Sequence, residues 1–427
     1  MRHTNRFTTN LDADPGTQDI RSGRHSVSVL SLNSWEDLER RRPEWEQLLL
    51  DSSSASNFWT PEWLGAWWRA FANGRKTACT LFLGRNDEVV GLAGLYFEWI
   101  NTFLRTKLLR LRFLGDGTSD SVRLDLIIKR GHEEDCAQAF VDWLSSESGW
   151  DICELNTLPA DSAVLPHLLS TLSARKWQYR TLMTPCSAIP LPESWEKYLS
   201  QIPKKERSKI NRRTKEVGNK FRVSFRKCTD EAELPFALDM LFELHQKRWK
   251  QRGLPGSFSS AERRAFYQEM ALSFLKRGWL EFWQMTLDGK PVASEFAFRY
   301  RDTVYALQKG FDPEYMADSV GYVLEAHVLQ TLIREGVRCY DYLGGGEASK
   351  QRLGAQESHY VNLHFARPFT AGALFLRMAQ AGSSTKAWLK VNLPPGLLNI
   401  VKGTYHALWH PINSISEEKP EKPDAGE

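Results

Sequence analysis

The alternation of hydrophobic and polar positions predicts two stretches of strands and helices in the same order. A period of two residues predicts strands, and apolar residues three and four apart predict helices. In the first stretch, strands are predicted at 77–84, 89–99, 122–129 and 150–157, and helices at 133–146 and 163–175. In the second, strands are predicted at 279–287, 290–300, 303–309 and 337–343, and a helix at 321–335. The pattern is typical of an α/β fold.

The shared order indicates a duplicated α/β unit. Val90-Gly91 matches Val292-Ala293, and Cys153 matches Cys339 in the equivalent strand. We therefore expect two tandem domains, each a mixed, mostly antiparallel sheet flanked by helices. Their predicted bounds are 27–190 and 191–370, followed by C-terminal helices at 371–413. The polar segments 1–26 and 414–427 are predicted to be disordered.

Composition limits the class of protein and its compartment. The chain has 427 residues and a net charge of +4, which suits a globular protein of two domains. Its six cysteines form no C-x-x-C pair and are expected to be free thiols in a reducing compartment. The N-terminus has no apolar signal region, and no apolar run approaches the ~20 residues of a membrane span. A cytoplasmic protein is predicted, and contact with the inner face of a membrane is left open.

Positive charge is concentrated between the two halves. Residues 197–227 contain twelve lysines and arginines against two glutamates, a local net charge of +10. The densest part, 204–215, is predicted to be helical. Such a run is usually a solvated helix face, but a charge of this size can also attract an anionic partner. Coenzyme phosphates, an anionic glycan precursor, a membrane surface and tRNA all fit that description.

A turn before the second-half helix forms a candidate phosphate cradle. It consists of Ser319, Val320, Gly321 and Tyr322, at the point where a strand gives way to a helix. The first N–H groups of a helix have no partner within it, and they converge with the helix dipole on an anion. The alternative is a helix capped by Ser319 or Asp318, with no ligand.

A second candidate segment follows the strand at 337–343. It reads Tyr340-Asp341-Tyr342-Leu343 followed by three glycines, with Lys350 and Arg352 beyond them. Glycines at a strand end let a substrate approach the backbone. Lys350 could pair with a phosphate or a carboxylate, or neutralise an oxyanion. The alternatives are a glycine hairpin with a solvated lysine, and an Asp341 that caps a loop or pairs with Arg338.

Together these segments resemble the GNAT acyltransferase superfamily, most closely its CelD-like branch, with the Fem aminoacyltransferases as relatives. The resemblance implies two GNAT-like domains, with the second holding the pyrophosphate of acyl-CoA at residues 319–322. The chain has Ser319-Val320-Gly321 where relatives often have Ser-Pro-Gly, and it lacks the arginine and double-glycine signature of ordinary GNAT enzymes. The aromatic-Asp-aromatic-Leu strand and the following lysine keep the CelD-like pattern.

The resemblance also implies catalytic roles. Glu295, a carboxylate in an apolar strand, is the first choice for general base, and the alternative is a salt bridge with Arg299. Tyr340 or Tyr342 would protonate the leaving sulfur, and Asp341 and Lys350 complete the catalytic set. Residues expected to border the acceptor are His245, Arg248, Trp249, Tyr342 and Arg352. The alternative for the first three is packing on the sheet. No metal is expected.

The function implied is N-acyl transfer from acyl-CoA, acetyl-CoA above all, to an amine of a small molecule or a glycan precursor. The CelD-like resemblance associates this activity with exopolysaccharide, cellulose or cell-envelope biosynthesis. One alternative is a Fem-like transferase that uses aminoacyl-tRNA. The other is a non-catalytic GNAT scaffold.

Overall fold

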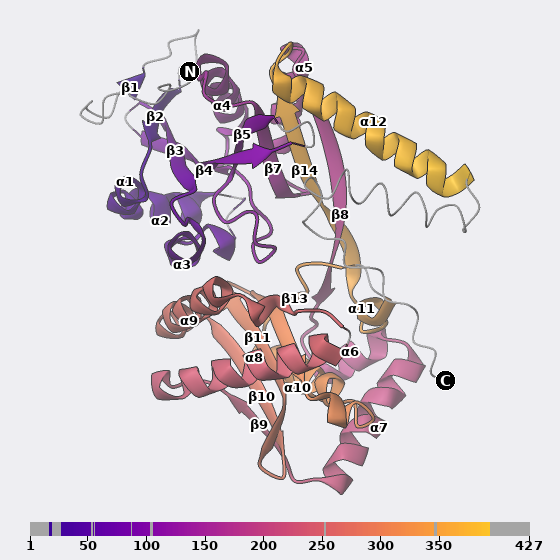
Figure 1. Cartoon of the computed structure of the whole chain (residues 1–427). Coiled ribbons are helices and arrows are strands. Elements are labelled where there is room, and N and C mark those ends of the chain that lie inside the picture. Colours follow the sequence, from indigo (N-terminus) through magenta and orange to yellow (C-terminus); the bar gives the residue numbers. More distant parts are fainter. Residues whose placement is uncertain are drawn as a thin grey trace.

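A computed structural model describes residues 17–18 and 27–392, except for 53, 55, 87, 103–105, 252 and 346–347. The predicted tail 414–427, residues 393–413 of the predicted helical region and the predicted disordered segment 1–26, apart from 17–18, lie outside these residues. In the described part of the chain, one 14-stranded sheet runs through two lobes (Figure 1).

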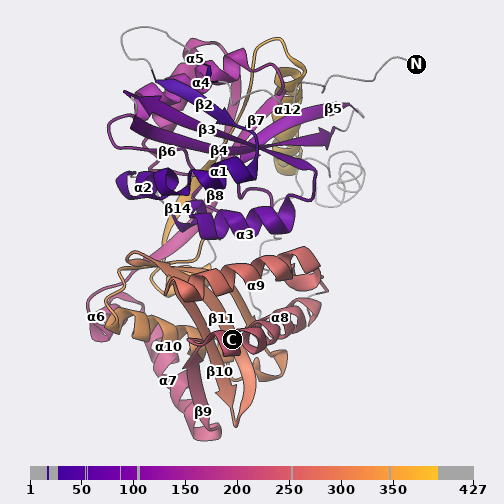
Figure 2. The ribbon, with the colours of Figure 1, turned by 90° about the vertical axis from the view of Figure 1, so that its left-hand side faces the viewer.

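The N-terminal lobe (N-lobe, residues 27–177) is built on antiparallel strands with one parallel addition. Strands β2, β3, β4 and β5 are antiparallel neighbours, and β7 lies parallel to β5 because helix α4 makes the crossover between them. Helices α4 and α5 cover one face of the sheet and α1, α2 and α3 the other (Figure 2). The strands are β2 (Ser28–Leu32), β3 (Lys76–Arg85), β4 (Glu88–Asn101), β5 (Lys107–Phe113), β6 (Ile127–Ile128) and β7 (Ile152–Pro159); the short β1 (Thr17–Gln18) pairs with β2. The helices are α1 (Trp35–Arg40), α2 (Arg42–Asp51), α3 (Pro61–Phe71), α4 (Glu133–Ser146) and α5 (Leu165–Ala174).

The C-terminal lobe (C-lobe, residues 191–355) repeats this plan. Strands β9 to β12 are antiparallel neighbours, and β13 lies parallel to β12 after the crossover helix α10. Phe296 and Phe298 of β11 pack toward α8 and α9, whereas Ala293 and Ala297 pack toward α10. The strands are β9 (Val223–Lys227), β10 (Leu280–Leu287), β11 (Lys290–Tyr300), β12 (Thr303–Phe311) and β13 (Cys339–Asp341). The helices are α6 (Trp195–Gln201), α7 (Lys204–Lys220), α8 (Leu234–Gln251), α9 (Ala261–Lys276), α10 (Val320–Arg334) and α11 (Ala348–Arg352).

The two lobes exchange their last strands. β8 (Gln178–Pro190) follows the N-lobe in the chain but pairs with β13 of the C-lobe, and β14 (Gln356–Ala366) follows the C-lobe but pairs with β7 of the N-lobe. β8 and β14 pair with each other over eleven residue pairs, and they form the long ribbon that joins the lobes in Figure 1. The final helix, α12 (Ala371–Asn392), packs on β14 and β8. Each lobe is therefore completed by a strand that the other half of the chain supplies.

The internal repeat is visible in the strand registers. Glu88 and Lys290 each pair with the residue that precedes their hairpin turn, so Val90-Gly91 and Val292-Ala293 occupy equivalent positions, as predicted. The predicted match of Cys153 with Cys339 is displaced by one residue. In the parallel ladders Ile152 and Cys339 each form the first pair, and Cys153 forms the second.

The strand predicted at 122–129 is wrong over most of its length. Only Ile127–Ile128 forms a strand, β6, which pairs with β4. Residues 114–126, which we call the β5–β6 loop, leave the sheet instead. Gly115 and Gly117 have positive φ there, and the aspartates at 116, 120 and 125 are buried. The apolar residues that suggested a strand, Leu124 and Leu126, are fully buried within this loop.

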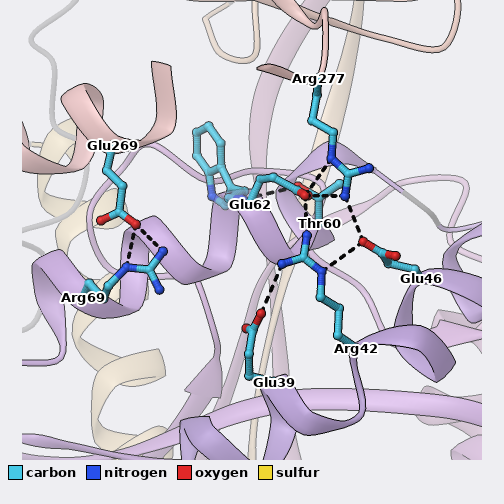
Figure 3. Close-up of polar contacts among 9 residues, drawn as sticks. Glu39, Arg42, Glu46, Thr60, Glu62, Arg69, Glu269 and Arg277 are labelled. Atoms are coloured by element: carbon cyan, nitrogen blue, oxygen red, sulfur yellow. Dashed lines mark hydrogen bonds and ion pairs between the residues drawn. The ribbon is translucent and has the colours of Figure 1, made fainter. Parts of the chain in front are cut away.

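An ion-pair cluster ties α9 of the C-lobe to α2 and α3 of the N-lobe (Figure 3). Glu62 of α3, whose side chain is 8% exposed, accepts hydrogen bonds from Arg42 and from Arg277, the latter at 2.8 Å. Arg277 also donates to Glu46 at 2.9 Å. Because Glu62 is held by an arginine from each lobe, the cluster fixes the two lobes against each other.

Candidate active site

The N-terminus of α10 carries unused hydrogen-bond donors. Ser319 ends the preceding turn in a left-handed conformation (φ 56°), and its side chain does not cap the helix. Asp318 instead pairs with Lys220 at 2.8 Å. Within the described residues, the N–H groups of Val320, Gly321 and Tyr322 donate to no partner. The alternative of a helix capped by Ser319 or Asp318 is therefore wrong, and three N–H groups remain open to a ligand.

Space and positive charge surround these donors. A Cβ placed on Gly321 would lie 3.6 Å from the ring of Phe311, which is ordinary contact, so a methyl group would fit there but a large side chain would not fit without displacing Phe311. Lys209 lies 4.4 Å from the centre of the Tyr322 ring, and Arg213 donates to the Ala317 carbonyl at 3.2 Å. The basic helix α7 thus runs beside the start of α10, and two signals that are separate in the sequence meet at one place.

Next to this helix, β12 and β13 separate. They pair only between Thr303–Tyr305 and Cys339–Asp341, and β12 continues to Phe311 paired with β11 alone among the described strands. The register of β11 and β12 also shifts between Phe296 and Ala297, which marks a bulge at Leu307. The edge of β12 from Ala306 onward is therefore open on the side where β13 has diverged.

Glu295 lies in a closed polar network under α10. Its Oε1 accepts a hydrogen bond from the Tyr340 hydroxyl at 2.5 Å, and its Oε2 lies 3.3 Å from the ammonium of Lys309. Lys309 also pairs with Glu325 at 2.7 Å, and Tyr342 donates to Glu325 at 2.8 Å. The predicted alternative of a Glu295–Arg299 salt bridge is wrong, since Arg299 pairs with Glu335.

This network holds two carboxylates against one ammonium. Burial and the charge of Glu325 raise the pKa of Glu295, although Lys309 opposes them. Burial also raises the pKa of Tyr340 well above its ordinary value. Tyr340 therefore keeps its hydroxyl proton and donates it in a hydrogen bond to Glu295.

Asp341 points away from this network. Successive strand residues face opposite sides of a sheet, so Tyr340 and Tyr342 face α10 whereas Asp341 faces the other side. Its Oδ1 accepts the N–H of Leu343 at 2.7 Å, which is the loop-capping role given above as an alternative. Burial raises the pKa of Asp341, and the Leu343 N–H, Arg123 and Lys350 oppose the rise. The carboxylate is nine-tenths buried and suited to accept a proton.

Lys350 and Arg352 lie on the short helix α11. Lys350 donates to the Gly344 carbonyl at 2.6 Å and lies over the ring of Tyr342, so it holds the glycine turn against the strand. Arg352 is more than half exposed and lies 4.0 Å from Glu206.

The predicted acceptor-side residues on α8 lie over the bulged strand. Trp249 donates to His245 Nε2 at 2.8 Å, and Arg248 lies over the ring of Phe311. Burial, with help from Arg248 and Arg263, lowers the pKa of His245 to about 4, so this histidine is neutral at physiological pH. A Cβ on Gly310 would lie 2.6 Å from the backbone nitrogen of His245, which shows how closely α8 approaches β12.

The N-lobe has no equivalent donor site in its described residues. Its crossover helix α4 begins with Glu133, Glu134 and Asp135, which would repel a phosphate, and Glu133 accepts the Gly131 N–H at 2.8 Å. Where β5 and β7 part, Arg112 pairs with Asp116 at 2.7 Å instead of leaving an opening. Among the residues that the structure describes, the open helix N-terminus beside basic side chains and diverging strands is therefore confined to the C-lobe.

Other features of the described residues lie elsewhere or are lacking. A groove of about 250 Å³ runs along the ion-pair cluster of Figure 3, lined by residues such as Arg69 and Lys276, away from α10. Ion pairs internal to the protein occupy its charged groups, so we do not take it for the active site. No cluster of metal-binding side chains occurs in the described ranges, and no helix there is long and apolar enough to cross a membrane.

Comparison with known proteins identifies the C-lobe. Residues 204–351 match the family described as "Acetyltransferase (GNAT) domain". No curated protein matches the chain. Similar solved structures include FemX, with 11% identity and a TM-score of 0.56 over 79% of this chain and 98% of that one.

Two further structures have TM-scores below 0.5. The C-terminal domain of a putative lysylphosphatidylglycerol synthetase from Agrobacterium fabrum has 10% identity and a TM-score of 0.46, covering 80% of this chain and 96% of that one. A tandem GNAT protein from the clavulanic acid biosynthesis pathway has 13% identity and a TM-score of 0.44, covering 79% and 98%.

Residues 204–351 therefore form a GNAT-type acetyltransferase domain, and the protein is an acyltransferase. The N-lobe repeats the strand order and the parallel β–α–β unit of this domain, which confirms the predicted pair of GNAT-like domains.

Proposed function

We propose that the protein transfers an acyl group from acyl-CoA to an amine, with the donor at the N-terminus of α10 and the acceptor on the opposite side of β13, toward the N-lobe. The observation that carries this proposal is the set of three open N–H groups at residues 320–322, beside diverging strands in a segment that matches the GNAT family. Such a helix terminus binds pyrophosphate through its N–H groups and its dipole. Bound there, acyl-CoA would supply a thioester as the activated acyl group.

The residues around the helix fit this donor. Gly321 places no side chain of its own at the helix terminus, and Lys209, Arg213 and Lys220 lie near the same terminus. The open edge of β12 offers backbone groups to an extended chain entering between the strands. We therefore assign Ser319, Val320, Gly321 and Tyr322 to donor binding.

The chemistry needs two proton transfers. An ammonium acceptor must first lose a proton, and we assign this proton to Asp341, whose position facing the N-lobe favours it over Glu295. The amine nitrogen then bonds to the acyl carbon and the C–S bond breaks. The second amine proton ends on the leaving sulfur, and Tyr340 or Tyr342, backed by the Glu295–Lys309–Glu325 network, would deliver it. Glu295 thereby acts as a relay, whereas the sequence alone favoured it as the base.

A second donor class is supported by the basic helix. Lys204, Lys205, Arg212 and Lys215 are exposed on α7, which runs beside α10. An aminoacyl-tRNA would present its acceptor end to the same diverging strands while its backbone lies along this helix. We rank acyl-CoA first because the open N–H groups suit a compact diphosphate. An anionic partner at 204–215, in solution or at a membrane surface, remains part of the proposal.

The acceptor and the pathway are proposed from the family resemblance alone. The CelD-like resemblance suggests a small molecule or glycan precursor used in exopolysaccharide, cellulose or cell-envelope biosynthesis. We also propose a cytoplasmic location, which six cysteines without a disulfide favour.

Calorimetry with acetyl-CoA tests the donor site. The wild-type protein should bind acetyl-CoA, Gly321→Trp should lose at least tenfold in affinity because the indole covers the N–H groups, and Gly321→Ala should bind nearly as well as wild type. A parallel titration with aminoacyl-tRNA separates the two donors. Equal binding of acetyl-CoA by the wild type and Gly321→Trp would contradict the assignment.

A further inference from the structure

The β5–β6 loop of the N-lobe reaches into the C-lobe at the acceptor side of the active site. Asp120 of this loop accepts a hydrogen bond from Tyr267 at 3.0 Å, and its other oxygen lies 3.2 Å from Arg263; both partners belong to α9. Ser56 donates to the Arg123 carbonyl at 3.2 Å. The loop is thus fixed at both ends of the segment 120–123.

Arg123 is held in an unfavourable backbone conformation. Its φ is 53°, in the left-handed region, which is unfavourable for a residue other than glycine. Its neighbours Ser121, Leu124 and Asp125 are buried, whereas Arg123 itself is only partly buried. Strain that the surrounding structure enforces in this way is common where a side chain has to be aimed at a ligand.

The guanidinium of Arg123 has no partner in the described part of the chain. It makes no hydrogen bond to any described residue and no carboxylate lies within ion-pair distance, although arginine carries five donors. The strand face that carries Asp341 lies beside this loop: Phe58, two residues from Ser56, packs against the Tyr305 ring at 5.9 Å, and Tyr305 pairs with Asp341 in the β12–β13 ladder. The ionisable groups that act on Arg123 come from four segments: the Tyr305 hydroxyl on β12, the Tyr360 hydroxyl on β14, the Asp341 carboxylate on β13 and the Asp161 carboxylate of the N-lobe.

Two of these neighbours also have unused hydrogen-bonding capacity. Asp341 uses only Oδ1, for the Leu343 N–H, and its Oδ2 accepts no hydrogen bond from the described residues. The Tyr360 hydroxyl is buried, and only the Cys186 thiol, a weak hydrogen-bonding group, lies beside it. A buried polar group without a partner is costly unless a ligand satisfies it. A cation and an anion, neither paired with the other, therefore face one site.

We propose that the acceptor amine carries an oxyanion, a carboxylate or a phosphate, which Arg123 binds while Asp341 receives the ammonium. This inference rests on the proposed function and specifies its substrate class. Arginine suits a planar or tetrahedral oxyanion because it can donate two parallel hydrogen bonds. The Asp341 carboxylate then pairs with the ammonium and takes its first proton, in the sequence of bond changes given above.

The test compares two matched pairs of amines: glucosamine 6-phosphate with glucosamine, and glycine with glycinamide. Release of coenzyme thiol from acetyl-CoA gives kcat and KM for each. In the wild type, the anionic member of at least one pair should have at least tenfold higher kcat/KM, mainly through KM. The pair that responds distinguishes phosphate from carboxylate.

Variants of Arg123 assign the preference to this residue. Arg123→Gln should reduce kcat/KM for the anionic amine to that of its neutral partner, Arg123→Lys should keep part of the preference, and Arg40→Gln, at an exposed arginine of the same lobe, should keep all of it. No preference in either pair, or one that survives Arg123→Gln, would overturn the inference. The acetyl-CoA titration described above keeps this outcome distinct from failure of the proposed function, because Arg123 lies on the side of β13 away from the donor site.

Discussion

Lys309 shows how a single residue can escape sequence reasoning. If pairs are counted outward from Tyr300 and Thr303, Gln308 falls opposite Glu295. The bulge at Leu307 adds one residue to β12, and Lys309 takes that place instead. Glu295 could be identified from its residue type and its apolar surroundings. Its cationic partner Lys309 could not be predicted, because no residue type at 306–308 indicates a bulge.

Removing Lys309 should leave two buried carboxylates facing each other. We expect Lys309→Met to lower the free energy of unfolding at pH 8 by about 3 kcal/mol or more. Glu295→Gln should cost less, because Lys309 remains paired with Glu325 at 2.7 Å. Urea denaturation of both variants measures the difference. If Lys309→Met were as stable as Glu295→Gln, the two carboxylates, Glu295 and Glu325, would not be shielded from water as described.

Asp125 predicts a dependence of stability on pH. Burial raises the pKa of this fully buried carboxyl to about 7, against about 4 in an unfolded chain. A raised pKa means that the folded state holds the proton more tightly than the unfolded state. The stabilisation is present below pH 4 and is lost as the pH rises through 7, by up to about 4 kcal/mol.

Asp125→Asn, which stays uncharged, should therefore lose less stability than the wild type between pH 4 and pH 8. Denaturation at the two pH values measures the effect, and the exposed Asp239→Asn serves as control. If the wild type and Asp125→Asn lost stability in parallel, Asp125 would not be the group that titrates.

At the scale of elements, the hairpins and the crossover helix could be predicted and the exchanged strands could not. β10, β11 and β12 are apolar runs joined by short turns, and α10 shows its buried face at Leu324, Val328, Leu329 and Leu332. β8 contains Pro185 and ends at Pro190, and much of its surface is exposed, so it lacks the pattern of a buried strand. Its partner β14 lies more than 150 residues away, and no local signal reports such pairing.

The contact of α8 with β12 should tolerate no added atom. Gly310→Ala places a methyl group 2.6 Å from the His245 backbone nitrogen, so α8 or β12 has to shift. We expect a loss of about 1–3 kcal/mol in stability, together with weaker activity because the shift reaches the bulge. Gly321→Ala, whose methyl group meets only Phe311 at 3.6 Å, is the matched control. Thermal denaturation of the two variants should separate them, and equal stability would mean that α8 yields easily.

At the scale of the molecule, the sequence indicated two domains but not that neither completes its own sheet. β7 lies between β5 and β14, and β13 lies between β12 and β8, so each lobe needs a strand from the other half of the chain. Duplication preserved the order of elements, whereas the exchange depends on where the chain crosses from one lobe to the other. The position of that crossing is set by the assembled protein, and the hydrophobic periodicity of the sequence does not indicate it.

Separate halves should not fold independently. Fragments 27–190 and 191–392 would each expose an unpaired strand edge and the apolar residues beneath it. We expect low secondary-structure content or aggregation in each alone, and recovery of a cooperative transition when they are mixed and refolded together. Circular dichroism with a denaturant titration measures this. A sharp unfolding transition in either fragment by itself would contradict the dependence.

The eleven-pair ladder between β8 and β14 also constrains how the enzyme can work. Many transferases close around their substrates by rotating one half about a flexible linker, which expels water. Here two strands of backbone connect the halves and are hydrogen-bonded to each other along their length, so such a rotation would break the ladder. Substrates must then enter and leave without a large change in the distance between the two lobes.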